Sequence, residues 1–399
     1  MTNRFVSRSV ARLAAVCFAG LTSLATPGVL KGAAPGLAQS QSQPSGSSVQ
    51  HEGDNWIWRS SQGGGILEVR IRKAAKFNED YTDVVELAEG GSIKIKDTRA
   101  RSGKTSGDRR LEVTRNPDGS VKRDYSGNGH AAAAADEDKR WLAEVLKLAA
   151  RQGGLDAANR AKTLLKRFGQ KGLLDEIAQL GPDDVKRIYL EESIKGRGFD
   201  REPASRILDI VSTGMKSDYD KSIVLREFAG KYSGVAGLIP EFLKAVSTIS
   251  ADHERALVLS AAVGNDAARG ALAVELLKSA AAMKSDFEKA NLLCRVRVAE
   301  LTDGDARTAF FDAFKSISAD YDKGRVLTSL LDQYPERDVL LLTINATAVI
   351  SSDYEKAAVL VVAASRGGGD DSIRVAIDGA ASQIRSEQER SRVLSATAR

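Results

Sequence analysis

The chain has 399 residues, of which 42% are hydrophobic and 28% are charged, so it is long enough to bury a large core and to form more than one domain. Its formal net charge is +5 at pH 7, and it contains only three histidines and two cysteines. This composition argues against a disulfide-rich scaffold and against a dedicated metal site.

Residues 1–38 have the pattern of an export signal. The pattern consists of a basic start with Arg4, Arg8 and Arg12, an apolar run from Leu13 to Leu24, and the small residues Gly36-Leu37-Ala38 before a cleavage point. The apolar run is too short and too interrupted for a membrane-spanning helix. We therefore predict a periplasmic or extracellular protein whose mature chain starts at Gln39 and has no transmembrane segment.

Cleavage of the signal would change the net charge and the number of cysteines. The predicted signal contains four basic residues and no acid, so the mature chain has a formal net charge of about +1. A chain so close to neutrality is not expected to bind nucleic acid. Cleavage also removes Cys17 and leaves Cys294 without an intramolecular partner. We expect Cys294 to be a small core residue.

A linker and a β-domain follow. Residues 39–53 are polar and small, which predicts a disordered linker. In residues 54–130 apolar and polar residues alternate, as at Leu67, Val69 and Ile71. Turn signals such as Asn116-Pro117-Asp118-Gly119 separate the alternating runs. The pattern predicts an antiparallel sheet of five or six strands with one apolar face.

Two stretches of the β-domain have a possible chemical interpretation. Ser102-Gly103-Lys104-Thr105 resembles the end of a phosphate-binding loop, but Thr98 replaces the first glycine and a strand follows, so we interpret it as a hairpin loop. The stretch from Lys94 to Asp124 holds ten basic and five acidic residues. It is either a surface for an anionic partner or, as we favour, a solvated polar face of the sheet.

Residues 131–399 have the 3.6-residue periodicity of helices. A first helix with Trp141, Leu142 and Val145 on its apolar side is expected to cover the sheet or to join it to the following helices. The predicted fold class is therefore α+β, mostly α: a small N-terminal antiparallel β-domain followed by an α-solenoid of helical hairpins, similar in period to HEAT or TPR arrays.

One element recurs along this helical domain: apolar, any residue, Ser or Ala, acid, usually an aromatic, acid, base, two variable residues, and then a Val-Leu or Leu-Leu pair. Its aromatic position is occupied by Tyr219, His253, Phe287, Tyr321, Tyr354 and Gln388, at steps of 34, 34, 34, 33 and 34 residues. A fixed period of this length indicates stacked hairpins. Lys186 to Leu190 resembles part of the element, which predicts a degenerate repeat before the first clear one.

The start of the element predicts the start of a helix. The Ser-x-x-Glu spacing of Ser352 and Glu355 is typical of a capping box. In two copies an alanine, Ala251 or Ala319, replaces the serine. There we expect the following aspartate, Asp252 or Asp320, to cap the helix or to interact favourably with its positive end. The Val-Leu pairs that follow predict a buried stripe.

The recurrent Asp, Tyr and Lys have two interpretations. On the first interpretation they form a row of binding groups. On the second the aspartate is a helix cap, the tyrosine packs in the core and the lysine is a solvated charge. We favour the second, because His253 and Gln388 can replace the tyrosine, as a packing position allows. On this interpretation, replacing Lys323 by alanine costs at most about 1 kcal/mol, as for an exposed charge.

No catalytic, cofactor or metal site is predicted, and the binding residues remain unknown. His51, His130 and His253 fall in the linker, in a loop and in an aromatic position, without metal-ligand spacing. Gly-x-Ser-x-Gly is absent, and the carboxylates fall at helix starts and on polar faces, so no acid–base pair stands out.

Several segments resemble a group of uncharacterised exported bacterial proteins with helical repeats. They are Phe77-Asn78-Glu79-Asp80-Tyr81-Thr82-Asp83, Arg110 to Arg115, Lys186 to Leu190, and the repeated Ser-Asp-Tyr-Asp/Glu-Lys element. The module is also similar to the extracytoplasmic tails of membrane metallopeptidases of the β-lactam-sensor type. The resemblance covers residues 64–399 and implies an architecture. It implies no catalytic residue, because the zinc motif and membrane helices of those peptidases are absent here.

We therefore predict a non-catalytic scaffold, exported to the cell envelope, that binds a protein or peptide partner. Stacked hairpins offer a continuous groove for such a partner. One alternative, suggested by the resemblance, is a soluble regulatory or sensory partner of an envelope signalling system. Another is a hydrolase of an envelope polymer, which would require two converging carboxylates in a pocket at the junction of sheet and helices.

Overall fold

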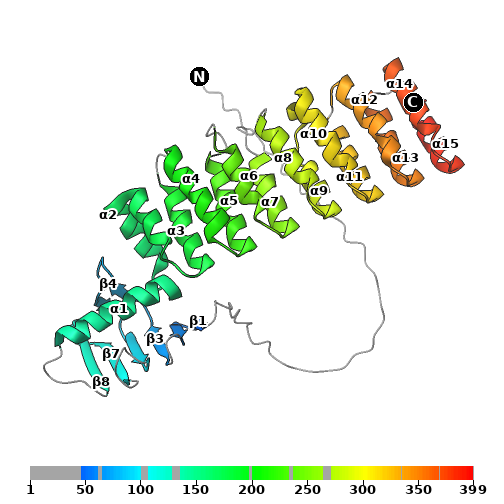
Figure 1. Cartoon of the computed structure of the whole chain (residues 1–399). Helices are drawn as coiled ribbons and strands as arrows, with labels where there is room; N and C mark the ends of the chain where they lie inside the picture. The colour runs from blue at the N-terminus through cyan, green and yellow to red at the C-terminus, as the bar shows by residue number, and fades with distance from the viewer. Residues whose placement is uncertain are drawn as a thin grey trace, which may run out of the picture. The chain divides into compact units, whose positions relative to one another are not determined.

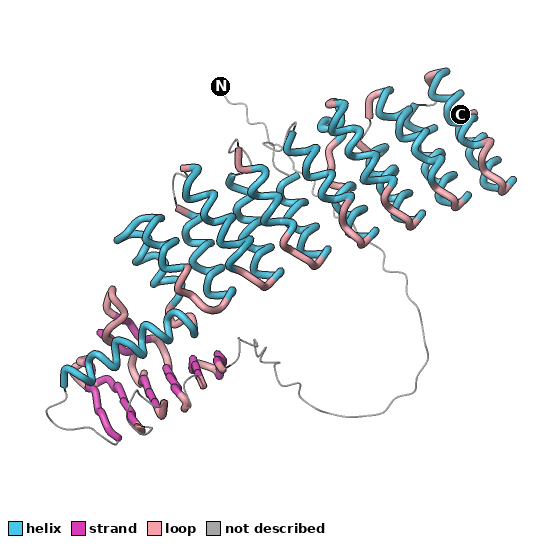
Figure 2. Tube along the Cα trace, viewed as in Figure 1, coloured by secondary structure: helices cyan, strands magenta, loops and turns pink. Residues whose placement is uncertain are grey.

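The computed structural model describes residues 46–61, 65–99, 107–127, 135–196, 200–232, 237–263, 271–333, 335–367 and 369–398. The predicted export signal, the segment Ser102 to Thr105 and His130 lie outside these residues. Within them, an antiparallel sheet precedes a long series of helices (Figures 1 and 2), which confirms the predicted α+β, mostly α class. None of the described helices is long and apolar enough to cross a bilayer.

The main sheet has six strands in the order β1-β2-β3-β6-β7-β8, and every neighbouring pair is antiparallel. The strands are β1 (Ser47–Glu52), β2 (Asn55–Ser60), β3 (Leu67–Arg72), β6 (Ser92–Asp97), β7 (Arg109–Arg115) and β8 (Val121–Gly127). A separate hairpin contains β4 (Ala75–Phe77) and β5 (Val84–Leu87). The register aligns Val69, Ile95 and Leu111, which are all buried. The predicted alternation therefore forms one apolar face.

Strand β1 corrects the predicted linker. It lies inside residues 39–53, and Val49 is paired with Trp58 in register with β2. The turn between the two strands contains Gly53 with φ of +57°, a backbone conformation that glycine adopts without strain. Pairing with β2 satisfies the backbone groups on the inner edge of this polar strand, so composition alone misjudged it.

Helix α1 (Ala135–Gly153) packs its apolar side on the sheet, which confirms the first of the two predicted roles. Trp141 and Val145 are buried in the core that they share with Val69 and Val113. The indole Nε1 of Trp141 donates a hydrogen bond of 3.0 Å to Oδ2 of the buried Asp97. This bond satisfies both polar groups where helix and sheet meet.

The remaining helices form hairpins that stack in sequence order (Figure 1). After α2 (Ala157–Ile177), which is interrupted at Gly169, come the first helices of the hairpins: α3 (Asp183–Lys195), α5 (Asp218–Tyr232), α7 (Asp252–Val263), α9 (Asp286–Leu293), α11 (Asp320–Leu331), α13 (Asp353–Gly367) and α15 (Glu387–Thr397). The second helices are α4 (Arg201–Asp209), α6 (Ile239–Ser247), α8 (Ala271–Ala281), α10 (Gly304–Lys315), α12 (Arg337–Ala346) and α14 (Asp371–Ala381). Each described first helix contacts the first helices of its neighbours.

The predicted apolar stripe is the seam of the stack. Val326 and Leu327 of α11 are completely buried, and the equivalent pairs Val224-Leu225 and Val258-Leu259 are buried as well. They belong to one continuous core that extends from Ala157 to Val393. A hairpin therefore completes its core on its neighbours, as the period predicts.

The basic position of the element is not a solvated charge, so that part of the prediction is wrong. The ammonium groups of Lys221, Lys289 and Lys323 donate to the carbonyl oxygens of Thr248, Ser316 and Val349, at 3.1, 2.8 and 2.9 Å. All three lysines are buried. Each carbonyl lies at the C-terminal end of the following second helix or just after it, where orphan carbonyls and the helix dipole favour a cation.

We expect Leu327→Ala to lower the free energy of unfolding by about 2–5 kcal/mol, as a large-to-small change in a packed core. Lys323→Ala should cost about 1–3 kcal/mol, because it removes the charge-assisted hydrogen bond that this buried ammonium group donates to the carbonyl of Val349. Urea denaturation followed by circular dichroism measures both. Lys315→Ala on α10, whose side chain is 60% exposed, is the matched control and should cost less than about 1 kcal/mol. Equal losses for Lys323→Ala and Lys315→Ala would contradict the buried role.

Candidate functional site

The turn before each first helix is held by an aspartate of the preceding hairpin. Oδ2 of Asp286, the first residue of α9, accepts hydrogen bonds from the backbone N–H groups of Ser318 and Ala319, at 2.8 and 3.0 Å. The same pair of bonds is made by Asp183, Asp218, Asp252, Asp320 and Asp353 to the turns at 216–217, 250–251, 284–285, 351–352 and 385–386. We call these six residues the aspartate ladder. Its first member confirms the degenerate repeat around Lys186.

The ladder changes the interpretation of the helix starts. The predicted serine caps are present, since Oγ of Ser285 accepts from the backbone N–H of Glu288 at 3.3 Å. Ala319, however, has no capping side chain of its own. Its N–H is bound by Asp286, whereas Asp320 binds the next turn. The prediction that Asp320 and Asp252 cap their own helices is therefore wrong. The alternative, that they lie at the positive end of the helix, is confirmed, because they are the first residues of α11 and α7.

The aromatic position directly follows the ladder residue and is exposed. The residues Tyr219, Phe287, Tyr321 and Tyr354 are 61, 57, 64 and 60% exposed, and the side chain of His253 is 65% exposed. Gln388, the sixth occupant, is exposed too. The predicted packing role is wrong, because the buried stripe of the first helix lies on another side. We call the row from Tyr219 to Tyr354 the aromatic edge.

Side chains of the next hairpin border the aromatic edge. The guanidinium carbon of Arg325 lies 5.4 Å from the ring centroid of Phe287 and 5.9 Å from that of Tyr321, so these two centroids are no more than about 11 Å apart. Arg325 is fixed by Oδ1 of Asp322 and Oδ1 of Asn291, both at 2.8 Å. Arg392 lies over Tyr354 in the same way. These cation–π contacts hold exposed rings in place.

An acidic side chain borders His253. Nδ1 of His253 lies 2.9 Å from Oε1 of Glu288 on the next first helix. This hydrogen bond raises the pKa of His253 above its usual value. The surroundings of the edge therefore carry both signs of charge, with Glu288 at His253 and Arg325 at Phe287 and Tyr321. Such a surface suits a partner with both polar and apolar groups better than a polyanion.

Residues considered for other chemistry have structural partners. Burial raises the pKa of the half-buried Cys294, so this thiol is not an activated nucleophile. At the junction of sheet and helices, Asp156 accepts a 2.8 Å hydrogen bond from the hydroxyl of Tyr81, and Glu176 pairs with Arg151 and Arg160 at 2.8 and 2.7 Å. Both carboxylates are thus engaged in an ion-pair and hydrogen-bond network rather than converging as acid and base.

The basic stretch of the β-domain is largely neutralised within the sheet. Lys94 pairs with Glu112 of the neighbouring strand at 3.0 Å, and Lys122 pairs with Asp124 at 3.0 Å. These pairs fit a solvated polar face. Among the described residues, no group of three or more His, Cys, Asp or Glu side chains is placed to hold a metal ion.

Comparison of the chain with protein-family models, with curated proteins and with solved structures finds no match.

Replacing a ladder residue should weaken the stack at one interface. We expect Asp286→Ala to lower the free energy of unfolding by about 1.5–3 kcal/mol, because it removes two charge-assisted hydrogen bonds to the next turn. Asp312→Ala, on the neighbouring α10 with a side chain that is 64% exposed, is the matched control and should change little. Chemical denaturation of both variants gives the comparison. A ladder variant as stable as the control would mean that the bonds contribute nothing.

The ladder should also make the stack sensitive to acid. Partial burial raises the pKa of Asp286, but the hydrogen bonds from Ala319 and Ser318 outweigh burial and hold this pKa below the usual range. The pKa of Asp353 is lowered chiefly by the bond from Ser386. A depressed pKa stabilises the fold above the unfolded value of about 3.9, and this contribution is lost as the pH falls through the lower folded-state pKa.

We therefore expect the free energy of unfolding to be nearly constant from about pH 7 to pH 5 and to fall below about pH 4. Asp286→Asn should reduce the slope of that fall. Urea titrations at a series of pH values test this, and an acid limb of equal slope in both proteins would argue against the assignment.

Proposed function

We propose that this chain is an exported, non-catalytic scaffold that binds an extended peptide segment of a protein partner in the cell envelope, and that the aromatic edge is the contact surface. The observation that carries the proposal is the repeated exposure of one aromatic or imidazole side chain per hairpin, from Tyr219 to Tyr354. Exposed rings are costly to hydrate, and rings fixed by neighbours are typical of interface hot spots.

The spacing of the rings fits an extended chain. Phe287 and Tyr321 are at most about 11 Å apart. A segment in the extended polyproline-II conformation advances about 3.1 Å per residue with three residues per turn, so every third side chain would lie on one side, about 9 Å from the last, and could meet successive rings. Arg325 between the two rings has five N–H donors, of which two are used by Asp322 and Asn291. The others are available for carbonyl groups of the bound segment.

The other candidate functions have less support. A regulatory partner of an envelope signalling system remains compatible with the same edge and rests on the family resemblance. It would require the bound protein to be a membrane sensor. The polymer hydrolase has no support from the junction, where the partners of Asp156 and Glu176 account for their charge.

The proposal is tested by placing a photo-crosslinker at the edge. Tyr321→p-benzoylphenylalanine should capture a defined envelope protein, whereas the same change at Phe168 should not. Phe168 is 55% exposed but lies on α2, outside the row. The captured segment is then synthesised, and its affinity is measured by calorimetry for the native chain and for variants.

Phe287→Ala combined with Tyr321→Ala should weaken this affinity about 30-fold or more, since a hot-spot truncation costs more than about 1 kcal/mol. Phe168→Ala should leave it unchanged. Capture of the same proteins from both crosslinker positions, or an affinity indifferent to the double variant, would rule out the edge as the binding surface.

A further inference from the structure

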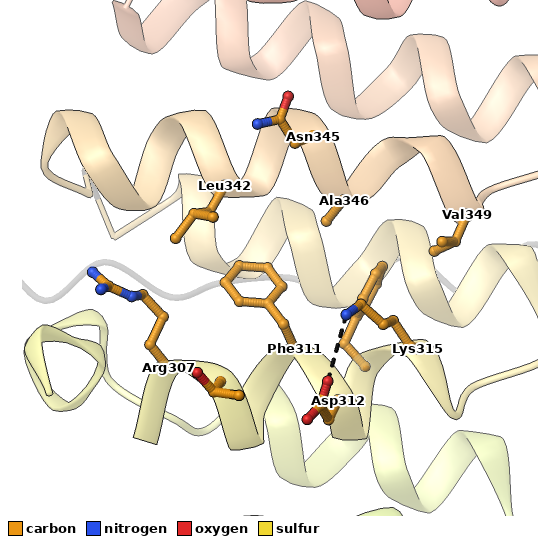
Figure 3. Close-up of a pocket in the computed structure, with 10 residues that line it drawn as sticks. Arg307, Phe311, Asp312, Lys315, Leu342, Asn345, Ala346 and Val349 are labelled. Carbon is orange, nitrogen blue, oxygen red and sulfur yellow. Dashed lines mark hydrogen bonds and ion pairs between the residues drawn. The ribbon is translucent and has the colours of Figure 1, made fainter. Parts of the chain in front are cut away.

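The second helices of the hairpins are separated at one place in the stack. Helix α10 packs closely on α8, and α12 packs closely on α14, but α10 and α12 have far fewer contacts with each other. The hairpin that contains α12 is the one whose period is 33 residues instead of 34. A pocket of about 330 Å³ lies between α10 and α12 (Figure 3).

The pocket has an apolar interior that is partly exposed. Phe311 of α10 points toward Leu342 and Ala346 of α12, and Val349 lies at one end (Figure 3). Leu342 and Val349 are 37 and 40% exposed. Outside the aromatic edge, only three other large apolar residues of the described helices are exposed to this degree: Phe168, Val375 and Leu394. Two of the five therefore line one pocket.

Basic groups lie at both ends of the pocket. Arg307 lies at one end and Lys315 toward the other (Figure 3). Lys315 pairs with Asp312 at 3.4 Å, and both side chains are mostly exposed, so this pair is weak. Within the part of the chain that the structure describes, the guanidinium of Arg307 has no hydrogen bond or ion pair. The rim is therefore positive overall and has an unused guanidinium.

We propose that the α10–α12 pocket binds one large apolar side chain of a protein partner and that Arg307 pairs with a carboxylate next to it in the partner sequence. The volume of the pocket is at the lower end of the range for ligand pockets, so it suits a single side chain. The apolar group would be covered by Phe311, Leu342, Ala346 and Val349. A guanidinium binds a carboxylate through two parallel N–H···O bonds. The pocket opens to solvent between the helices, which leaves room for the peptide backbone.

This site does not depend on the aromatic edge. It lies on second helices, whereas the edge follows the starts of first helices. The two sites can therefore be tested separately, and loss of one proposal leaves the other intact.

The experiment uses the chain from Gln39 onward, which contains every described residue, with ¹³C-labelled alanine, leucine and valine methyl groups. It is titrated with acetyl-Trp-Asp-Asp-amide and, in parallel, with acetyl-Trp-Lys-Lys-amide and acetyl-Gly-Asp-Asp-amide. The first peptide should shift the methyl signals of Leu342, Ala346 and Val349 and leave those of Val375 in place. The lysine peptide should bind more weakly, and the glycine peptide should cause no shift.

Variants separate the two parts of the proposal. Arg307→Gln should weaken binding of the acidic tryptophan peptide about two- to fivefold, the effect of one exposed ion pair. Lys278→Gln on α8, an exposed cation outside the pocket, is the control and should have no effect. Ala346→Phe should fill the pocket and abolish the shifts. If circular dichroism shows that this variant is unfolded, Leu342→Lys, at a partly exposed position, replaces it.

Three results would overturn the proposal. They are the absence of shifts at millimolar peptide, shifts spread over the chain with no preference for the pocket, and equal affinity for the acidic and the lysine peptides. The last result would show that Arg307 does not select a carboxylate.

Discussion

The stack depends on the hydrogen bonds between the carboxylate of each ladder aspartate and the backbone of the next turn. Each carboxylate binds two adjacent N–H groups of the next turn, so it fixes both the distance between neighbouring hairpins and their rotation about the stack. Hydrophobic contact between stripes is not directional and would allow sliding. A buried lysine at the other end of the same helical turn, such as Lys323 on the carbonyl of Val349, adds a second directional contact. Together these two contacts join each first helix to the end of its own hairpin and to the turn that begins the next one.

The shortened hairpin keeps both of these contacts. Asp320 still binds the N–H groups of Ser351 and Ser352, at 2.9 and 2.7 Å, although the chain between them is one residue shorter than at Asp286. The shorter spacing therefore leaves the contacts between the first helices unchanged. It coincides with the separation of α10 from α12, where Leu342 and Val349 are left partly exposed. The pocket thus lies in the layer of second helices, beside the shortened hairpin.

The same contacts explain why the aromatic edge is a candidate for binding. In the repeat that begins at Ser285, the serine, Asp286 and Lys289 have capping or bridging partners and the leucine pair is buried, whereas Phe287 between them is left in solvent. Neither the helix cap nor the packing of the core requires an aromatic ring at Tyr321. Arg325 holds two such rings without covering them, and a partner that buries them would gain apolar area at little cost in side-chain ordering.

The sequence by itself determined the period, the buried Val326-Leu327 stripe, the serine caps and the alternating strands, because each depends on residues close in the chain. It did not determine the partners of Asp286 or Lys323, the exposure of Tyr321 or the pairing of β1, for which composition predicted a linker. These depend on groups about one hairpin away or, for β1, on a neighbouring strand. An aspartate at a helix start can cap its own helix or the next turn, and only the orientation of stacked hairpins decides between them.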